Sequence, residues 1–183
     1  MGGKKVTPVE REQENRQYPR SWDWMVVSGN CHYTKDRASF MTYRPIQKMI
    51  RTRMIFSGLR DTYVAGVGIV KLKVCTSSDE GSQNGVLVLE NVLHVPSAIC
   101  HGFNSRSYHD RNGGEVAAHE GNWRGFDKNG KPLWYGVPFF GFQKLALVGN
   151  QQEDPTFGSI GLFYPGWDLE ISDKDLKSIL CED

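Results

Sequence analysis

The sequence predicts a mainly β domain that ends in one short helix. Three observations carry this prediction: residues 63–74 end in an alternation of apolar and charged side chains, residues 86–95 form an apolar run closed by Pro96, and an Asn129-Gly130 pair separates two further segments. These patterns are typical of strands and hairpins. The chain has 20 glycines among its 183 residues, which suits short strands joined by many turns.

The N-terminal twenty residues are polar and charged and show no apolar periodicity. We therefore interpret residues 1–21 as a disordered N-terminal arm and residues 22–183 as a single domain. A short apolar strand is expected at residues 24–28. In the charged segment that follows, Pro45 argues against a long helix, because proline lacks the amide donor that a helix interior needs.

The clearest strand signal lies in residues 63–74, where Val70, Leu72 and Val74 alternate with two lysines. This alternation predicts a strand with one buried and one exposed face. Residues 86–95 are apolar almost throughout, which predicts a strand covered on both faces.

The Asn129-Gly130 pair predicts a two-residue hairpin with a type I′ turn. Further apolar runs at residues 145–148 and 160–164 add to the β content. One helix is expected, from Ser172 to Leu180. Ser172 and Asp175 stand at the spacing of a capping box, and the apolar side of this helix carries Leu176, Ile179 and Leu180.

Charge is distributed unevenly, although the net charge is only +1. Residues 35–73 carry nine Lys or Arg against two Asp, and residues 150–183 carry eight Asp or Glu against two Lys. This asymmetry indicates either a surface for nucleic acid or mutual attraction between the two regions, and the second interpretation is favoured. The basic run that would contact nucleic acid consists of Arg44, Lys48, Arg51, Arg53 and Arg60.

No run of eighteen apolar residues is present, so a membrane span is not expected. The N-terminus has no apolar signal-peptide core, which predicts a cytoplasmic or nuclear location. The four cysteines show no CxxC spacing and are expected to be free thiols. Two Cys-His pairs, Cys31-His32 and Cys100-His101, could form a zinc site or a thiolate–imidazole pair, but neighbouring residues of a strand point to opposite faces. We expect packing roles for them, no metal and no cofactor.

The segment Trp24-Met25-Val26-Val27-Ser28-Gly29-Asn30 is followed by His32, Asp36-Arg37 and Phe40. Farther along the chain stand Gly66-Val67-Gly68-Ile69-Val70-Lys71-Leu72 and Leu89-Glu90-Asn91-Val92-Leu93-His94-Val95-Pro96. In this order, the motifs resemble the protease segment of copia-type LTR retrotransposon polyproteins, most strongly over residues 22–148. The chain is similar to stand-alone, host-encoded copies of this segment found in fungi. The resemblance implies a retropepsin-like, acid-protease-type β-barrel with a short C-terminal helix.

The chain departs from that family at the catalytic loop. Val27 stands where the family has its catalytic aspartate, Asn30 replaces an alanine, and the family's Asn-Leu-Leu-Ser support has become His101-Gly102-Phe103-Asn104-Ser105. Aspartic proteases need two carboxylates that share one proton. The resemblance therefore implies a pseudoprotease that does not cleave peptides by the ancestral mechanism. Retropepsin domains pair to complete their cleft, so a homodimer is allowed, although nothing in the sequence requires it.

Three functions remain open. The leading hypothesis is a domesticated, non-proteolytic module that binds a small molecule, peptide or protein. Its expected ligand-binding residues are Ser28, Gly29, Asn30, His32, Arg37 and His94. The first alternative is a small-molecule enzyme of the isomerase, cyclase or lyase type that uses His32, Tyr33 and Asp36 for acid–base chemistry. The second alternative is a nucleic-acid-associated protein that uses the basic run.

Overall fold

The computed structural model describes residues 23–54, 58–79, 83–139, 141–149 and 168–181. Strands dominate this part of the chain, which confirms the mainly β prediction. The strands are β1 Trp24–Val27, β2 Tyr33–Thr34, β3 Phe40–Met54, β4 Gly58–Cys75, β5 Asn84–His94, β6 His101–Asn104, β7 Glu115–His119, β8 Asn122–Phe126, β9 Pro132–Phe139, β10 Phe142–Leu145 and β11 Glu170–Ile171. The helical elements are η1 Arg37–Ser39, α2 Ser105–Asn112 and α4 Asp173–Leu180. The predicted arm at residues 1–21 and the apolar run at 160–164 lie outside the described residues.

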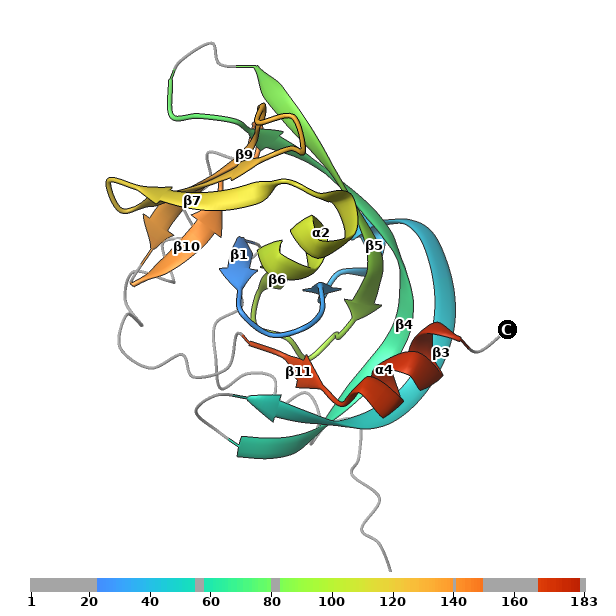
Figure 1. The fold of residues 1–183 in the computed structure, drawn as a ribbon. Coiled ribbons are helices and arrows are strands. Elements are labelled where there is room, and N and C mark those ends of the chain that lie inside the picture. The colour runs from blue at the N-terminus through green and yellow to red at the C-terminus, as the bar shows by residue number, and fades with distance from the viewer. Residues whose placement is uncertain (1–22, 55–57, 80–82, 140, 150–167, 182–183) are drawn as a thin grey trace, which may run out of the picture.

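The strands form one large mixed sheet in the order β11-β3-β4-β5-β2-β6-β1-β10-β9-β8-β7. Two neighbouring pairs, β1 with β6 and β2 with β5, are parallel. The sheet ends at β11 on one side and at β7 on the other, so the described strands do not close into a barrel. Figure 1 shows the long strands β3, β4 and β5 curving around α2, while β7 to β10 lie on the other side of that helix and α4 lies beside β3.

Strand β1 is buried on both faces and separates two apolar cores. Trp24 and Val26 face one core, which also contains Phe103 and Trp134. Met25 and Val27 face the other core. Because side chains alternate across a strand, one four-residue segment contributes to both cores. Val27 therefore lies in the second of these cores.

The predicted burial of β4 is confirmed, with Val70, Leu72 and Val74 buried and the lysines between them exposed. The prediction for residues 86–95 is wrong for the first half of β5, where buried Leu87 and Leu89 alternate with exposed residues. Only the part after residue 91 is buried continuously. The first half has one solvent-facing side because nothing in the described chain covers it fully.

The predicted hairpin at Asn129-Gly130 joins β8 to β9, but its turn is not type I′. Type I′ needs positive φ at both central residues, and only Gly130 has it, with φ of 76°. The amide of Gly130 donates to the carbonyl of Asp127 at 2.9 Å, and the Asp127 carboxylate accepts from the amides of Asn129 and Lys131. This arrangement is a turn closed by the Asp127 side chain and followed by a left-handed glycine. The acidic residue two positions before Asn129 therefore determines the turn.

Helix α2 was not predicted from the sequence. Its sequence, SRSYHDRN, has little apolar periodicity, and its buried side chains include Tyr108 and His109. Its signals are at the ends: Asn104 caps the helix by accepting from the amide of Ser107 at 2.7 Å, and Gly113 ends it with φ of 77°. Those two caps would have identified the helix.

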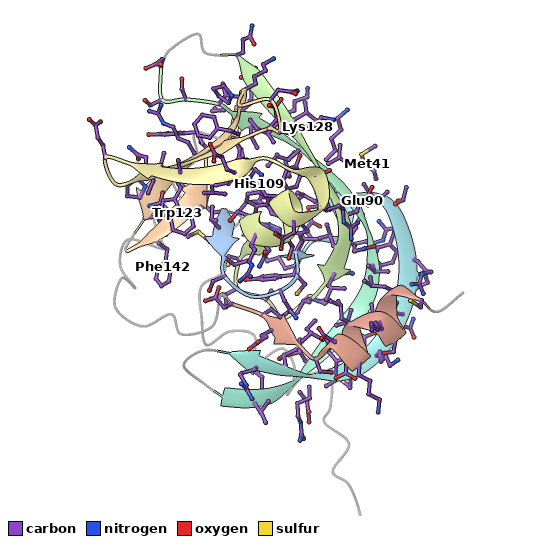
Figure 2. The ribbon with its side chains drawn as sticks, in the orientation of Figure 1. Met41, Glu90, His109, Trp123, Lys128 and Phe142 are labelled. Carbon is purple, nitrogen blue, oxygen red and sulfur yellow. The ribbon has the colours of Figure 1, made fainter. Side chains whose placement is uncertain are left out.

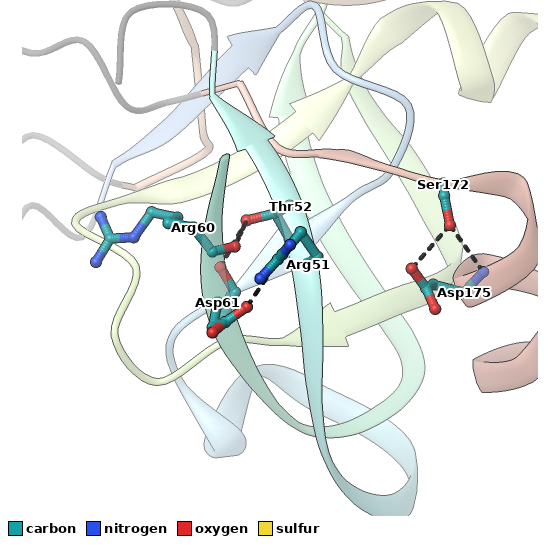
Figure 3. Close-up of polar contacts among 7 residues, drawn as sticks. Arg51, Thr52, Arg60, Asp61, Ser172 and Asp175 are labelled. Carbon is teal, nitrogen blue, oxygen red and sulfur yellow. Dashed lines mark hydrogen bonds and ion pairs between the residues drawn. The ribbon is translucent and has the colours of Figure 1, made fainter. Parts of the chain in front are cut away.

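The C-terminal helix is confirmed as α4, Asp173–Leu180. Ser172 is its N-cap: the Ser172 hydroxyl accepts from the amide of Asp175 at 3.1 Å and donates to the Asp175 carboxylate at 2.7 Å, as Figure 3 shows. Ile179 is fully buried in the second core, and Leu176 and Leu180 pack against it. The helix thereby fastens the C-terminal segment to β3.

Candidate functional site

The loop that follows β1 is covered by the C-terminal segment 168–171. The amide of Ser28 donates to the carboxylate of Asp168 at 2.6 Å. The side-chain amide of Asn30 donates to the carbonyl of Ile171 at 2.7 Å and accepts from the Ile171 amide at 3.0 Å. A two-point contact of this kind fixes the neighbouring strand in one register. Asn30, expected to contact a ligand, thus uses its side chain to hold β11.

Gly29 is required by close packing and not by a left-handed turn. Its φ does not fall in the positive range, but a Cβ at this position would lie 2.2 Å from the carbonyl oxygen of Leu169. Gly29 was expected to contact a ligand, and the structure instead places the backbone of Leu169 against it. The constraint arises because the C-terminal backbone lies directly against it.

The side chain of Asn104, the last residue of β6, hydrogen-bonds both to this loop and to α2. Strand β6 runs parallel to β1 with Val27 opposite Asn104. The side-chain amide of Asn104 donates to the carbonyl of Gly29, while its oxygen caps α2. One buried side chain therefore ties the loop after β1 to the start of α2, and the relative position of these two elements is fixed.

His32 is the best-placed functional side chain of the predicted set. It is 6% exposed and stacks on Phe103 with ring centroids 5.8 Å apart. Its Nδ1 accepts from the amide of Asn104 at 3.1 Å, which leaves Nε2 as the protonated donor of the neutral ring. Burial, and then the nearby charge of Arg111, lower the His32 pKa to about 4. The ring is therefore neutral at physiological pH.

A pocket of about 130 Å³ opens beside His32. Its walls come from the loop after β1, the middle of β5, α2, and the α4 residues Leu176 and Leu180. The polar residues that line it are Asn30, His32, Glu90, Asn91, Ser107, Arg111 and Asn112. The structure thus brings together two predicted residues, Asn30 and His32, with five polar residues that the sequence analysis did not identify.

The strongest charges at this pocket are paired with each other. Arg111 donates to the carboxylate of Glu90 at 2.5 Å, and both side chains are about half exposed (49% and 52%). Figure 2 labels Glu90 on β5 beside the helix. The pair joins α2 to β5 across the mouth of the pocket. Neither residue carries a local sequence signal, because the contact depends on α2 being a helix.

The three residues of the acid–base hypothesis do not converge. His32 lines the pocket, whereas Tyr33 is 3% exposed in the second core, where its hydroxyl lies 3.9 Å from the Cys100 sulfur. Burial is the first of several causes that raise the pKa of Tyr33 well above its usual value. Asp36 caps η1 by accepting from the amide of Ala38 at 2.9 Å. This placement leaves His32 without Tyr33 or Asp36 as a catalytic partner.

Arg37 and His94 lie apart from the pocket, around the ring of Tyr43. The guanidinium of Arg37 stacks over that ring at 3.7 Å from its centroid. His94 is 9% exposed, and its Nδ1 hydrogen-bonds with the Tyr43 hydroxyl at 2.9 Å. Burial lowers the His94 pKa. These residues form a packed aromatic cluster that stabilises the start of β3.

Part of the basic run contacts other parts of the chain. Arg44 donates to the carbonyl of Ile179 at 2.6 Å, where a cation is favourable at the end of α4, and Lys48 donates to the Ser178 hydroxyl at 3.0 Å. Arg51 pairs with Asp61 at 3.5 Å, as Figure 3 shows.

The remaining basic residues also lie on these strands. Arg53 on β3 stands opposite Glu170 on β11. The backbone carbonyl of Arg60 accepts from the Thr52 hydroxyl at 3.4 Å (Figure 3). Strand β3 thus lies beside part of the acidic C-terminal region.

The four cysteines are all described, and all are free. Cys31 and Cys100 are buried in the second core, where burial raises the pKa of each thiol to about 12. The Cys31 thiol donates to the carbonyl of Leu169 at 3.5 Å. Within the described ranges, no group of three or more His, Cys, Asp or Glu is arranged to hold a metal ion.

Comparison with known protein families, curated proteins and solved structures finds no match to this chain. Neither of the described α-helices has the length and apolar character that crossing a membrane requires. The function therefore has to be argued from the chemistry of the pocket.

Proposed function

We propose that this chain is a retropepsin-like module that has lost peptide cleavage and serves as a non-proteolytic binding protein. The proposed ligand-binding site is the pocket beside His32. The observation that carries the proposal is the environment of this histidine: its ring is buried, its Nδ1 accepts from a backbone amide, and the residue lines the pocket. Buried polar groups are normally satisfied, and one that lines a pocket marks a place where a ligand can satisfy it.

The retropepsin-like part of the proposal rests on the sequence motifs and on one contact. The segment that corresponds to the family's supporting Asn-Leu-Leu-Ser includes Asn104, and Asn104 hydrogen-bonds to Gly29 in the loop after β1. A supporting role for this segment is what the resemblance implies. The open sheet departs from the expected barrel, and the contact between Asn104 and Gly29 does not depend on closure.

Loss of cleavage follows from the surroundings of Val27. This side chain is 5% exposed and packs in an apolar core with Met25 and Cys31. The carboxylate of Asp168 hydrogen-bonds to the neighbouring residue, because it accepts from the amide of Ser28. Pepsin-type catalysis requires a pair of carboxylates around a water. Val27 has no carboxylate, so Val27 and Asp168 together do not supply such a pair.

The volume of the His32 pocket favours a small ligand group over a whole small molecule. A volume of about 130 Å³ is well below the ~300–1,000 Å³ of typical small-molecule sites. A single side chain or a terminal group of a larger partner fits this space. A peptide or protein that inserts one such group is therefore the favoured ligand class.

A peptide-display selection tests the proposal. Libraries selected on the wild-type chain should yield peptides whose binding is lost on His32→Gln. The matched control is Arg106→Gln on α2, whose side chain is 87% exposed and forms only an exposed ion pair with Asp110. It should bind normally. The same library should not be cleaved at acidic pH. Cleavage blocked by a statine-type inhibitor would overturn the proposal, and so would a selection in which every binder is indifferent to His32→Gln in the folded protein.

A further inference from the structure

The His32 pocket combines hydrogen-bond donors with an ion pair between Arg111 and Glu90. We infer that the pocket takes a carboxylate, presented by an acidic side chain or by the terminus of a partner peptide. This inference rests on the proposed function and adds the chemical class of the ligand group. Three features support it: the donor residues that line the pocket, the ion pair between Arg111 and Glu90, and the pocket volume.

The donors suit an anionic oxygen ligand. His32 is neutral with its proton on Nε2, since Nδ1 accepts from Asn104. Arg111 presents a planar fork of N–H groups that matches the two oxygens of a carboxylate. Both residues line the same pocket. An incoming carboxylate can therefore accept one hydrogen bond from the imidazole and one or two from the guanidinium.

The chain already supplies a carboxylate to this fork. Glu90 of β5 bonds Arg111 at 2.5 Å and lines the pocket with it. This internal pair shows that the mouth of the pocket accommodates a carboxylate. Because both side chains are about half exposed, solvent screens the pair and it contributes little to stability. A ligand carboxylate can compete with Glu90 for Arg111 at little cost.

Other occupants fit less well. A cation would meet one carboxylate, that of Glu90, which Arg111 already neutralises. A large apolar group exceeds a volume of about 130 Å³. A phosphate shares the affinity for arginine but carries more charge, and Glu90 would repel it more strongly. The carboxylate is the group that matches donors, charge and size together.

Titration of the protein with two blocked peptides, followed by amide chemical shifts, tests this inference. N-acetyl-Gly-Glu-Gly-amide should shift the signals of His32 and its neighbours in the pocket, and N-acetyl-Gly-Gln-Gly-amide should not. Acetate and phosphate, at constant ionic strength, form two further arms. Binding of acetate but not of the glutamate peptide would mean a site for free acids and would overturn the peptide part. Binding of phosphate alone would overturn the carboxylate.

Two variants make opposite predictions. Arg111→Gln should weaken binding of the glutamate peptide at least about tenfold, because it removes a charge-assisted hydrogen bond. Glu90→Gln removes the internal competitor and should strengthen binding about three- to tenfold. Arg106→Gln is the control and should change nothing. A Glu90→Gln variant that is folded and binds no tighter would overturn the inference, even if Arg111→Gln fails to fold.

The outcomes separate this inference from the proposed function. One outcome of display is a set of peptides that need His32 for binding but contain no acidic group or terminal carboxylate. Such peptides would refute carboxylate binding in the pocket and leave the binding function intact. A selection without His32-dependent peptides refutes the binding function itself.

Discussion

Substitution of Val27 by aspartate introduces the residue found in the protease motif that this segment resembles, and we expect it to destabilise the fold without producing a protease. Val27 is 5% exposed in an apolar core. Loss of its buried apolar surface costs about 1.5–3 kcal/mol. A buried carboxyl group without a partner adds about 1–3 kcal/mol even when it is neutral. The sum, roughly 2.5–6 kcal/mol, is a large part of the ~5–15 kcal/mol that stabilises a typical domain.

The cost of Val27→Asp should depend on pH in a defined direction. Burial disfavours the charged form, so the pKa of the new carboxyl would be raised in the folded state. Between its unfolded pKa, near 3.9, and that raised value, the folded state binds a proton that the unfolded state lacks. The free energy of unfolding should therefore fall as pH rises, by about 1.4 kcal/mol per pH unit.

Urea unfolding of wild type, Val27→Asp and Val27→Asn at pH 4.5, 5.5 and 6.5 measures this effect. The asparagine variant introduces similar polarity without a titrating group, so the gap between the two variants should widen with pH. A Val27→Asp protein as stable as wild type at every pH would refute the buried placement. Acquisition of statine-sensitive cleavage by this single change would refute the loss of the catalytic geometry as well.

Three further predictions concern the loop after β1 and the buried histidines. Gly29→Ala should lower the melting temperature more than Gly136→Ala, because the added Cβ would lie 2.2 Å from a backbone oxygen at the first position and 3.4 Å from its nearest neighbour at the second; equal shifts would contradict the packing described. Asn30→Ala should cost about 1–3 kcal/mol in denaturant unfolding and speed hydrogen exchange in β11, since it removes both side-chain hydrogen bonds to that strand; unchanged exchange would show that β11 is held otherwise. The free energy of unfolding should fall as pH is lowered from about 6.5 towards 5. Burial, aided by neighbouring cationic charge, lowers the pKa of both His32 and His101 to about 4. In that pH range only the unfolded chain takes up protons at these two residues. His32→Gln should reduce this slope by up to about 1.4 kcal/mol per pH unit, and an unaltered slope would place the ring in solvent.

Local patterns predicted the elements of this fold better than their arrangement. The alternation at Val70, Leu72 and Val74 identifies a strand because one face is buried along its whole length. The same reasoning failed for the first half of β5, where apolar side chains such as Val86 and Val88 are about 45% exposed. Apolar residues on a surface are common and carry no signal of their exposure. The pairing of β3 with β11 joins segments more than a hundred residues apart, which no local pattern encodes.

The candidate site was predicted in part. Asn30 and His32 were found because they stand beside a recognisable motif, and both line the pocket. Glu90 and Arg111 were missed because each looks like an ordinary surface charge until α2 and β5 are placed side by side. The position of the C-terminal segment over the loop was also missed, although it explains why Gly29 has no side chain.

Trp123 and Phe142 are exposed apolar side chains, and they form the alternative surface at which a peptide could bind. They are 40% and 37% exposed, and Figure 2 shows them on the β7–β10 side of the molecule, away from Glu90. The most direct measurement is an amide chemical-shift map of the chain saturated with a peptide selected by display. If the pocket binds the peptide, the largest shifts should cluster at residues 30–32, 88–91 and 107–112 around His32. Shifts concentrated around Trp123 and Phe142, with the pocket signals unmoved, would contradict binding at this pocket.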